Sequence, residues 1–152
     1  GYLFQNYALF PNMTVEENIM AGIQGKKAEK EQAQGIFNRL RVRAPSLETL
    51  IVNLSGGNQQ KVVLGKSLLA KPQILLIDEP TKGIDVGAKT EIYKLMNELV
   101  ESGVSIIMVS SDMPELVSMS DRCIVLSNSH ITGEFTGSDI TQDNVMRAAI
   151  AQ

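Results

Sequence analysis

Apolar residues after Pro45 form short unbroken runs. In each of the segments 73–77, 105–109 and 122–126, one polar residue is followed by four consecutive hydrophobic side chains. Runs of this kind are typical of strands that are covered on both faces, as in a parallel sheet. We therefore predict three strands of a parallel sheet there. A short strand is also predicted at residues 2–4. A turn is predicted at residues 127–129, and the chain is expected to return from it as a strand at residues 130–135.

A helix is predicted between the first two of these runs. Within residues 88–101 the apolar side chains recur about every 3.6 positions, which places them on one face of a helix that Gly103 would end. The residues assigned to this face are Ile92, Leu95, Met96, Leu99 and Val100. Because strands alternate with helices, the pattern predicts an open α/β sheet.

Other helices are predicted from their start signals and their polar patterns. Thr14 and Glu17 have the spacing of a capping box, in which each side chain accepts a hydrogen bond from the other residue's backbone amide. Residues 26–40 are charged and rich in helix-forming side chains, so we expect a solvated helix. A final helix is expected near the carboxyl terminus, capped by either Asp139 or Thr141.

Composition excludes several classes of protein. The chain has 152 residues, 14 basic and 17 acidic side chains and a formal charge of −3. This acidic balance argues against nucleic acid as a partner. No apolar run approaches the roughly 18 residues that a membrane span needs. The single cysteine, Cys123, is expected to be a small buried hydrophobe rather than part of a disulfide framework.

An acid pair follows the first buried strand. Asp78 and Glu79 come directly after residues 74–77, which are all apolar. The carboxyl ends of parallel strands form the edge at which open α/β sheets bind ligands. Asp78 is therefore a candidate ligand for Mg²⁺, and Glu79 is a candidate general base that polarises a water molecule. The alternative interpretation is that both acids cap the next loop.

A second candidate site lies at the start of a helix predicted to run to Ala70. Ser55 is a good helix cap, and Gly56 and Gly57 leave the backbone amides accessible to a ligand. A helix amino terminus with free amides and a hydroxyl can bind phosphate. The alternative interpretation is an ordinary capped helix with a flexible entry.

Together these two motifs resemble those of the ATP-binding cassettes of ABC transporters. Residues 54–59 resemble the signature motif, and residues 74–79 resemble the Walker B strand with its catalytic glutamate. Asp85 corresponds to the D-loop and Gln5 to the Q-loop. The resemblance implies Gln5, Ser55, Gly56, Gly57, Gln59 and Asp85 as ATP-binding residues, Asp78 and Gln5 as Mg²⁺ ligands, and Glu79 and Ser111 as catalytic residues. It also implies an α/β fold like that of P-loop NTPases, with ATP and Mg²⁺ as cofactors.

The resemblance also suggests an organisation and a transport role. Residues 1–12 would form the Q-loop region, residues 13–70 a helical subdomain with the signature, and residues 71–152 the Walker B, D-loop and switch region. Segments 53–61 and 78–89 are similar to the second cassette of ATPases that drive monosaccharide import, whereas residues 1–23 look more like importers of anions or polyamines. The implied partners are a second cassette, transmembrane permease subunits and, indirectly, a sugar-binding protein. The implied location is the cytoplasmic face of the membrane.

Two departures from the family pattern affect the expected activity. No segment matches the P-loop, because Gly65-Lys66-Ser67 lies inside the signature helix, so we expect a partial cassette whose P-loop precedes Gly1. Ser111 occupies the position of the switch histidine. A hydroxyl can bond to a phosphate oxygen but cannot carry positive charge. The alternative function is a degenerate cassette that only donates its signature to a partner's ATP site. His130 is expected to be an exposed turn residue.

Overall fold

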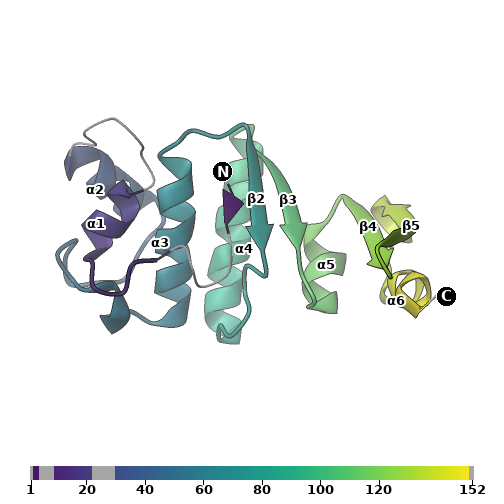
Figure 1. Ribbon diagram of the computed structural model, residues 1–152. Coiled ribbons are helices and arrows are strands. Elements are labelled where there is room, and N and C mark those ends of the chain that lie inside the picture. Colours follow the sequence, from purple (N-terminus) through teal and green to yellow (C-terminus); the bar gives the residue numbers. More distant parts are fainter. Residues whose placement is uncertain (1, 4–8, 22–29, 151–152) are drawn as a thin grey trace. The chain divides into compact units, whose positions relative to one another are not determined.

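The computed structural model describes residues 2–3, 9–21 and 30–150. The chain divides into two compact units, Gly1–Val109 and Ser110–Gln152. The predictions for residues 4 and 5 and for residues 22–29 lie outside the described residues. Figure 1 labels the helices and strands.

The first unit contains a parallel sheet. Its strands are β1 (Tyr2–Leu3), β2 (Ile74–Asp78) and β3 (Ser105–Val109), with β2 in the middle. All pairings are parallel, and Leu76 of β2 faces Ile107 of β3. The crossover between β2 and β3 is helix α4 (Val86–Glu101), which lies against the sheet (Figure 1). The predicted α/β sheet with a helix between its strands is confirmed.

The face of α4 that packs inward is slightly narrower than the sequence predicts. Four of the five assigned residues, Ile92, Leu95, Met96 and Leu99, are buried, whereas Val100 is 48% exposed. The assignment of Val100 is wrong because it lies about 100° around the helix from Leu99, on the rim of the apolar stripe. The helix ends at Glu101, and Gly103 follows with a φ of +94°.

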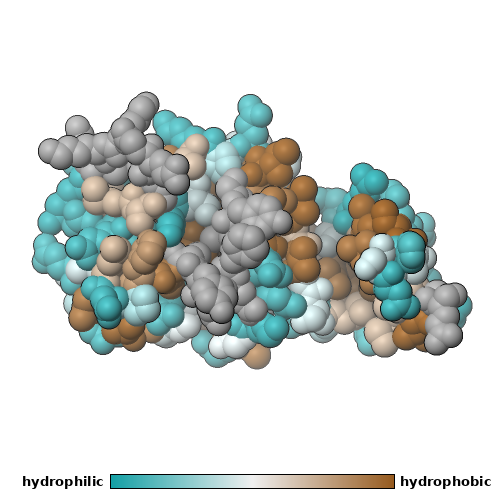
Figure 2. Space-filling model, viewed as in Figure 1, coloured by the Kyte–Doolittle hydropathy of each residue, from teal (hydrophilic) through white to brown (hydrophobic). Residues whose placement is uncertain are grey.

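One face of the sheet is less covered than expected. Leu75 and Ile77 of β2 are buried, but Ile74, Ile107 and Val109 are 53%, 54% and 60% exposed in the described part of the chain. Figure 2 shows hydrophobic surface over β2 and β3. The prediction that these strands are covered on both faces is therefore wrong for the described residues.

Three more helices of the first unit pack against one another. They are α1 (Val15–Met20), α2 (Lys30–Arg39) and α3 (Gly56–Leu68), with a short 3-10 turn at Ile51–Asn53 before α3. The capping box at α1 is confirmed, because the Glu17 amide donates to Thr14 Oγ1 (3.2 Å) and the Thr14 amide donates to Glu17 Oε2 (2.8 Å). Helix α3 ends at Leu68, two residues before the predicted end.

The Gly65-Lys66-Ser67 segment lies within α3, as expected. A Cβ atom at Gly65 would lie 2.6 Å from Ile36 Cγ2 and 2.9 Å from Leu40 Cδ1. Gly65 therefore allows α2 to approach α3 closely. Lys66 places its Nζ 4.7 Å from the ring centroid of Phe10. These contacts give the segment a packing role.

The second unit is a hairpin packed with two helices. Its elements are α5 (Met113–Met119), β4 (Arg122–Ser127), β5 (His130–Thr136), a 3-10 turn at Gly137–Asp139 and α6 (Gln142–Ile150). Cys123 is buried in the core of this unit, as predicted, together with Val125, Ile140, Val145 and Ala148. The amide of Asn144 donates to Thr141 Oγ1 (3.2 Å), so Thr141 is the residue that caps α6.

The prediction that residues 122–126 join the parallel sheet is wrong. β4 pairs antiparallel with β5, and Ser127 faces His130 across a two-residue turn. Both turn residues, Asn128 and Ser129, have positive φ, which is the backbone of a tight hairpin turn. Because the turn is so short, the chain returns directly as β5 and pairs antiparallel with β4. The burial of the side chains alternates along β4.

Candidate functional site

The signature turn (residues 54–59) exposes a serine at the mouth of a helix. Ser55 is the N-cap residue of α3, with φ −61° and ψ 155°, and its side chain caps no backbone amide. The first intrahelical bond of this turn runs from the Gln59 amide to the Ser55 carbonyl. The amides of the first turn of a helix have no intrahelical acceptor and lie at its positive end. The exposed Ser55 hydroxyl and these amides can together contact an anion.

The two glycines of the turn have different surroundings. Gly56 is exposed, and a Cβ there would meet only the Gly83 carbonyl, at 3.8 Å. Gly57 is buried, and its Cβ would lie 2.7 Å from the Ala88 Cβ and 3.6 Å from Ile84 Cγ2. Packing against the start of α4 thus requires glycine at 57. At Gly56 no such packing contact requires glycine.

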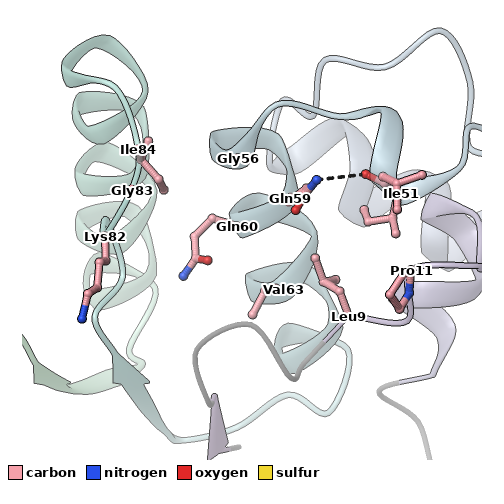
Figure 3. Close-up of a pocket in the computed structure, with 11 residues that line it drawn as sticks. Leu9, Pro11, Ile51, Gly56, Gln59, Gln60, Val63, Lys82, Gly83 and Ile84 are labelled. Atoms are coloured by element: carbon pink, nitrogen blue, oxygen red, sulfur yellow. Dashed lines mark hydrogen bonds between the residues drawn. The ribbon is translucent and has the colours of Figure 1, made fainter.

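The two amide side chains of the turn also differ. Gln59 Nε2 donates to the carbonyls of Ile51 (3.3 Å) and Leu54 (3.0 Å), so this side chain holds the turn to the preceding segment (Figure 3). Asn58, which was not among the predicted site residues, donates from Nδ2 to Ser55 Oγ (2.9 Å). The only sequence signal for Asn58 was its position three residues after the N-cap serine.

The acid pair lies at the carboxyl edge of the parallel sheet. Asp78 is the last residue of β2, and Glu79 follows it with a φ of +48°. The Glu79 amide donates to the carbonyl of Val109, the last residue of β3, at 2.7 Å. Both acids are partly exposed. A left-handed backbone is unfavourable for a side chain such as glutamate, and residues held in this way concentrate at functional sites.

The structure describes three more of the residues that the sequence singled out, Asp85, Ser111 and His130. Asp85 is exposed and caps α4, because its Oδ1 accepts from the Ala88 amide at 3.0 Å. Ser111 is an exposed residue of the second unit, just before α5. Gln5 lies outside the described residues. His130 is exposed beside the hairpin turn, as expected.

A pocket of about 450 Å³ lies next to the signature turn. Gly56, Gln59 and Gln60 line it from α3, and residues 82–84 line it from the loop that follows the acid pair (Figure 3). Leu9 lines it from a separate segment. The pocket therefore borders both the signature turn and the loop between β2 and α4.

A cluster of charged side chains links α3 to α4. Lys61 is buried, and its Nζ donates to Glu91 Oε2 (2.6 Å) and to the Arg41 carbonyl (3.1 Å). The other Glu91 oxygen accepts from Arg43 (2.6 Å). The hydrogen bond from Lys61, followed by the positive charges of Lys61 and Arg43, lowers the pKa of Glu91. The cluster therefore favours the ionised carboxylate.

The donor groups of the acid pair suit a hard divalent cation. Among the residues that the structure describes, no three His, Cys, Asp or Glu side chains gather where they could hold a metal ion. Mg²⁺ in nucleotide sites usually takes only one or two carboxylates, together with phosphate oxygens and water. Asp78 at the sheet edge is compatible with that mode of binding.

The fold and these two motifs define an ATP-binding cassette, and comparison with known proteins agrees. The family model described as ABC transporter matches residues 1–82, and the chain belongs to this family. A nucleotide-free ATP-binding cassette from an ABC transporter superposes with a TM-score of 0.83 at 21% identity, covering 99% of this chain and 68% of that one. A dimeric cassette in a post-hydrolysis state, bound to ADP and Pi, gives 0.76 at 25% identity, covering 90% and 62%.

Similar curated proteins are sugar importers' ATP-binding subunits. The xylose import ATP-binding protein XylG of Moorella thermoacetica is 52% identical over 124 residues, 82% of this chain and 25% of that protein. The ribose import ATP-binding protein RbsA 2 of Streptomyces coelicolor is 47% identical over 139 residues, 91% of this chain and 27% of that protein. The chain thus spans about a quarter of these relatives, and the resemblance to monosaccharide-importer cassettes is confirmed. No helix in the described ranges is long and apolar enough to cross a membrane.

Proposed function

We propose that the protein carrying this chain is the ATP-hydrolysing subunit of an ABC importer for a monosaccharide, and that it couples hydrolysis to transport. The observation that carries the proposal is the similarity, at about half of the aligned positions, to xylose and ribose import ATP-binding proteins. The exposed serine at the mouth of α3 and the acid pair at the sheet edge support a role with a phosphorylated ligand.

Each predicted residue takes a role in this proposal. Ser55 and the amides of Gly56 and Gly57 would contact the γ-phosphate of ATP bound by a second cassette, because these groups lie at the positively polarised amino terminus of α3. Gln59 would hold the signature turn in place, and Asp85 would fix the start of α4. We also propose that Gln59 and Asp85 contact ATP.

The acid pair would serve the chain's own nucleotide site. Asp78, together with Gln5, would hold Mg²⁺, which when bound neutralises phosphate charge. Glu79 would accept a proton from the attacking water, and Ser111 would donate a hydrogen bond to a phosphate oxygen. The position of Glu79 at the end of β2, with its amide bonded to Val109, supports a fixed orientation of this base.

The proposed partners and location follow from the same relatives. A second cassette would complete each ATP site, membrane-embedded permease subunits would receive the motion, and a sugar-binding protein would act indirectly. The protein would lie at the cytoplasmic face of the membrane as a peripheral subunit. Nucleic acid is not a proposed partner, in keeping with a formal charge of −3.

Replacing the proposed base tests the function. In the protein that carries this chain, assembled with its permease, Glu79→Gln should lower the rate of ATP hydrolysis by about 10²- to 10⁴-fold, because the amide cannot accept the proton. Phosphate release measured with Mg²⁺ and ATP is the readout. Glu101→Gln, on the exposed end of α4, is the matched control and should leave the rate unchanged. An unchanged rate for Glu79→Gln would remove Glu79 from this role.

A degenerate cassette is the second candidate function, and Ser111 at the switch position favours it. Such a cassette would donate its signature turn to a partner's ATP site without hydrolysing ATP itself. Ser55→Arg would then abolish turnover of the assembled transporter, whereas Glu79→Gln would leave it intact. Loss of turnover with both variants favours the hydrolysing subunit.

A further inference from the structure

Asn58 is held in one orientation by its two partners. Its Oδ1 accepts from the Arg43 amide at 2.7 Å, and its Nδ2 donates to Ser55 Oγ at 2.9 Å. A backbone N–H can only donate, so the oxygen of the Asn58 amide must face Arg43. The nitrogen must then face Ser55; flipping the amide would lose the bond to Arg43 and would make Ser55 the donor of the other bond.

This orientation determines what the Ser55 hydroxyl can do. Because Ser55 Oγ accepts a hydrogen from Asn58, the hydroxyl proton has to point in another direction. The same hydroxyl caps no backbone amide of α3, although capping is the usual role of a serine at this position. Ser55 is exposed, so its proton is available to an acceptor that approaches the mouth of the helix.

The support for Asn58 is itself anchored. Arg43, whose amide binds Asn58, also places its side chain 2.6 Å from Glu91 of α4. Glu91 is bonded to the buried Lys61, which lies on the same helix as Asn58. The backbone at Arg43 is thus held from both α3 and α4, and this limits the movement of the Asn58 side chain.

We propose that Asn58 is a positioning residue that keeps the Ser55 hydroxyl as an acceptor on one side, so that its proton is donated to the γ-phosphate of ATP on a second cassette. This inference rests on the proposed function and adds a residue to it. Asn58 acts through Ser55 and has no predicted contact with the nucleotide.

Reversing the direction of one hydrogen bond provides the test. In Asn58→Asp, one carboxylate oxygen can still accept from the Arg43 amide, but the other can only accept from Ser55, which turns the hydroxyl proton away from the phosphate. In the assembled transporter we expect kcat/KM for ATP to fall about tenfold to hundredfold, the range for a hydrogen bond to a charged group. Ser55→Ala alone should hydrolyse ATP slowly. When Asn58→Asp is added to Ser55→Ala, kcat/KM should fall by less than about twofold more.

Two controls separate positioning from charge and from folding. Gln60→Glu places the same negative charge two residues further along α3 and should change kcat/KM by less than about twofold. Asn58→Ala, which is neutral, should repeat the pattern of Asn58→Asp in both backgrounds, and thermal unfolding of each variant checks that it is folded. If Asn58→Asp misfolds, the cycle with Asn58→Ala decides the question.

The outcomes distinguish this proposal from the proposed function. Suppose that Ser55→Ala slows hydrolysis. If Asn58→Asp then lowers kcat/KM equally with and without Ser55, or lowers it no more than Gln60→Glu does, the positioning role of Asn58 is overturned and the proposed function stands. If Ser55→Ala hydrolyses ATP at the parental rate, the role of Ser55 in the proposed function fails, and the inference about Asn58 fails with it.

Discussion

At the scale of single residues, neighbouring residues of the signature turn have different structural roles. Gly56 is open to solvent, whereas Gly57 is pressed against Ala88 of α4. Gln59 turns back to the carbonyls before the helix, whereas Asn58 faces Ser55. A motif that reads in the sequence as one phosphate-binding unit therefore combines exposed groups with groups that pack or form internal hydrogen bonds.

Gly57 gives a prediction about packing. Gly57→Ala should destabilise the protein by about 1–3 kcal/mol, because its Cβ would lie 2.7 Å from the Ala88 Cβ and overpack the contact between α3 and α4. Chemical denaturation measures the loss. Gly56→Ala is the matched control and should be neutral or slightly stabilising, since only the Gly83 carbonyl lies near. Adding Ala88→Gly should restore stability to Gly57→Ala. A Gly57→Ala variant as stable as the parent would refute this explanation.

At the scale of elements, local signals could be read from the sequence, whereas the partner of β4 could not. The capping box of Thr14 and Glu17 depends on residues three apart, and the apolar stripe of α4 depends on one helix, so both could be predicted. The turn after β4 and the strand that returns from it were predicted, but β4 was assigned to the parallel sheet because its apolar residues follow one another without alternation. The contact between Asn58 and Arg43 joins a residue of α3 to a loop residue 15 positions earlier, and no periodicity indicates it.

The bond between α3 and α4 gives a prediction about pH. Glu91 has a lowered pKa in the folded protein, so it stabilises the fold above its unfolded pKa, near the ordinary value of 4.5, and this stabilisation is lost as pH falls through the lower folded value. At pH 7, Glu91→Gln should cost about 1–3 kcal/mol of unfolding free energy, because the buried Lys61 loses its counter-charge.

Urea denaturation at several pH values checks the role of Glu91. The gap between parent and Glu91→Gln should be widest near neutral pH and should narrow below about pH 4.5, as the parent's own Glu91 becomes protonated. Glu98→Gln removes an exposed partner of Arg41 at 3.5 Å and should cost only about 0–1 kcal/mol. A gap that stays constant down to acidic pH would contradict the proposed charge pairing.

At the scale of the whole molecule, the chain contains the signature turn and the acid pair but no P-loop motif in its 152 residues. The described sheet also leaves Ile74, Ile107 and Val109 more than half exposed. The family could be inferred from two short motifs because each depends on a few consecutive residues. How a complete ATP site is assembled could not, since in the proposed arrangement its parts come from two cassettes.

The last prediction concerns the 152-residue chain by itself. The positive end of a helix stabilises an anion by about 0.3–1 kcal/mol per charge, or up to about 2 kcal/mol in a partly buried site. Micromolar binding of a nucleotide needs about 8 kcal/mol. The signature turn therefore cannot hold ATP unaided, and Asp78 and Glu79 would be repelled by phosphate unless Mg²⁺ is present. We expect calorimetry with Mg²⁺ and ATP to detect no binding tighter than millimolar, and no phosphate release above the buffer rate. Turnover that Glu79→Gln removes would contradict this prediction, because the described residues would then form a working site without a P-loop.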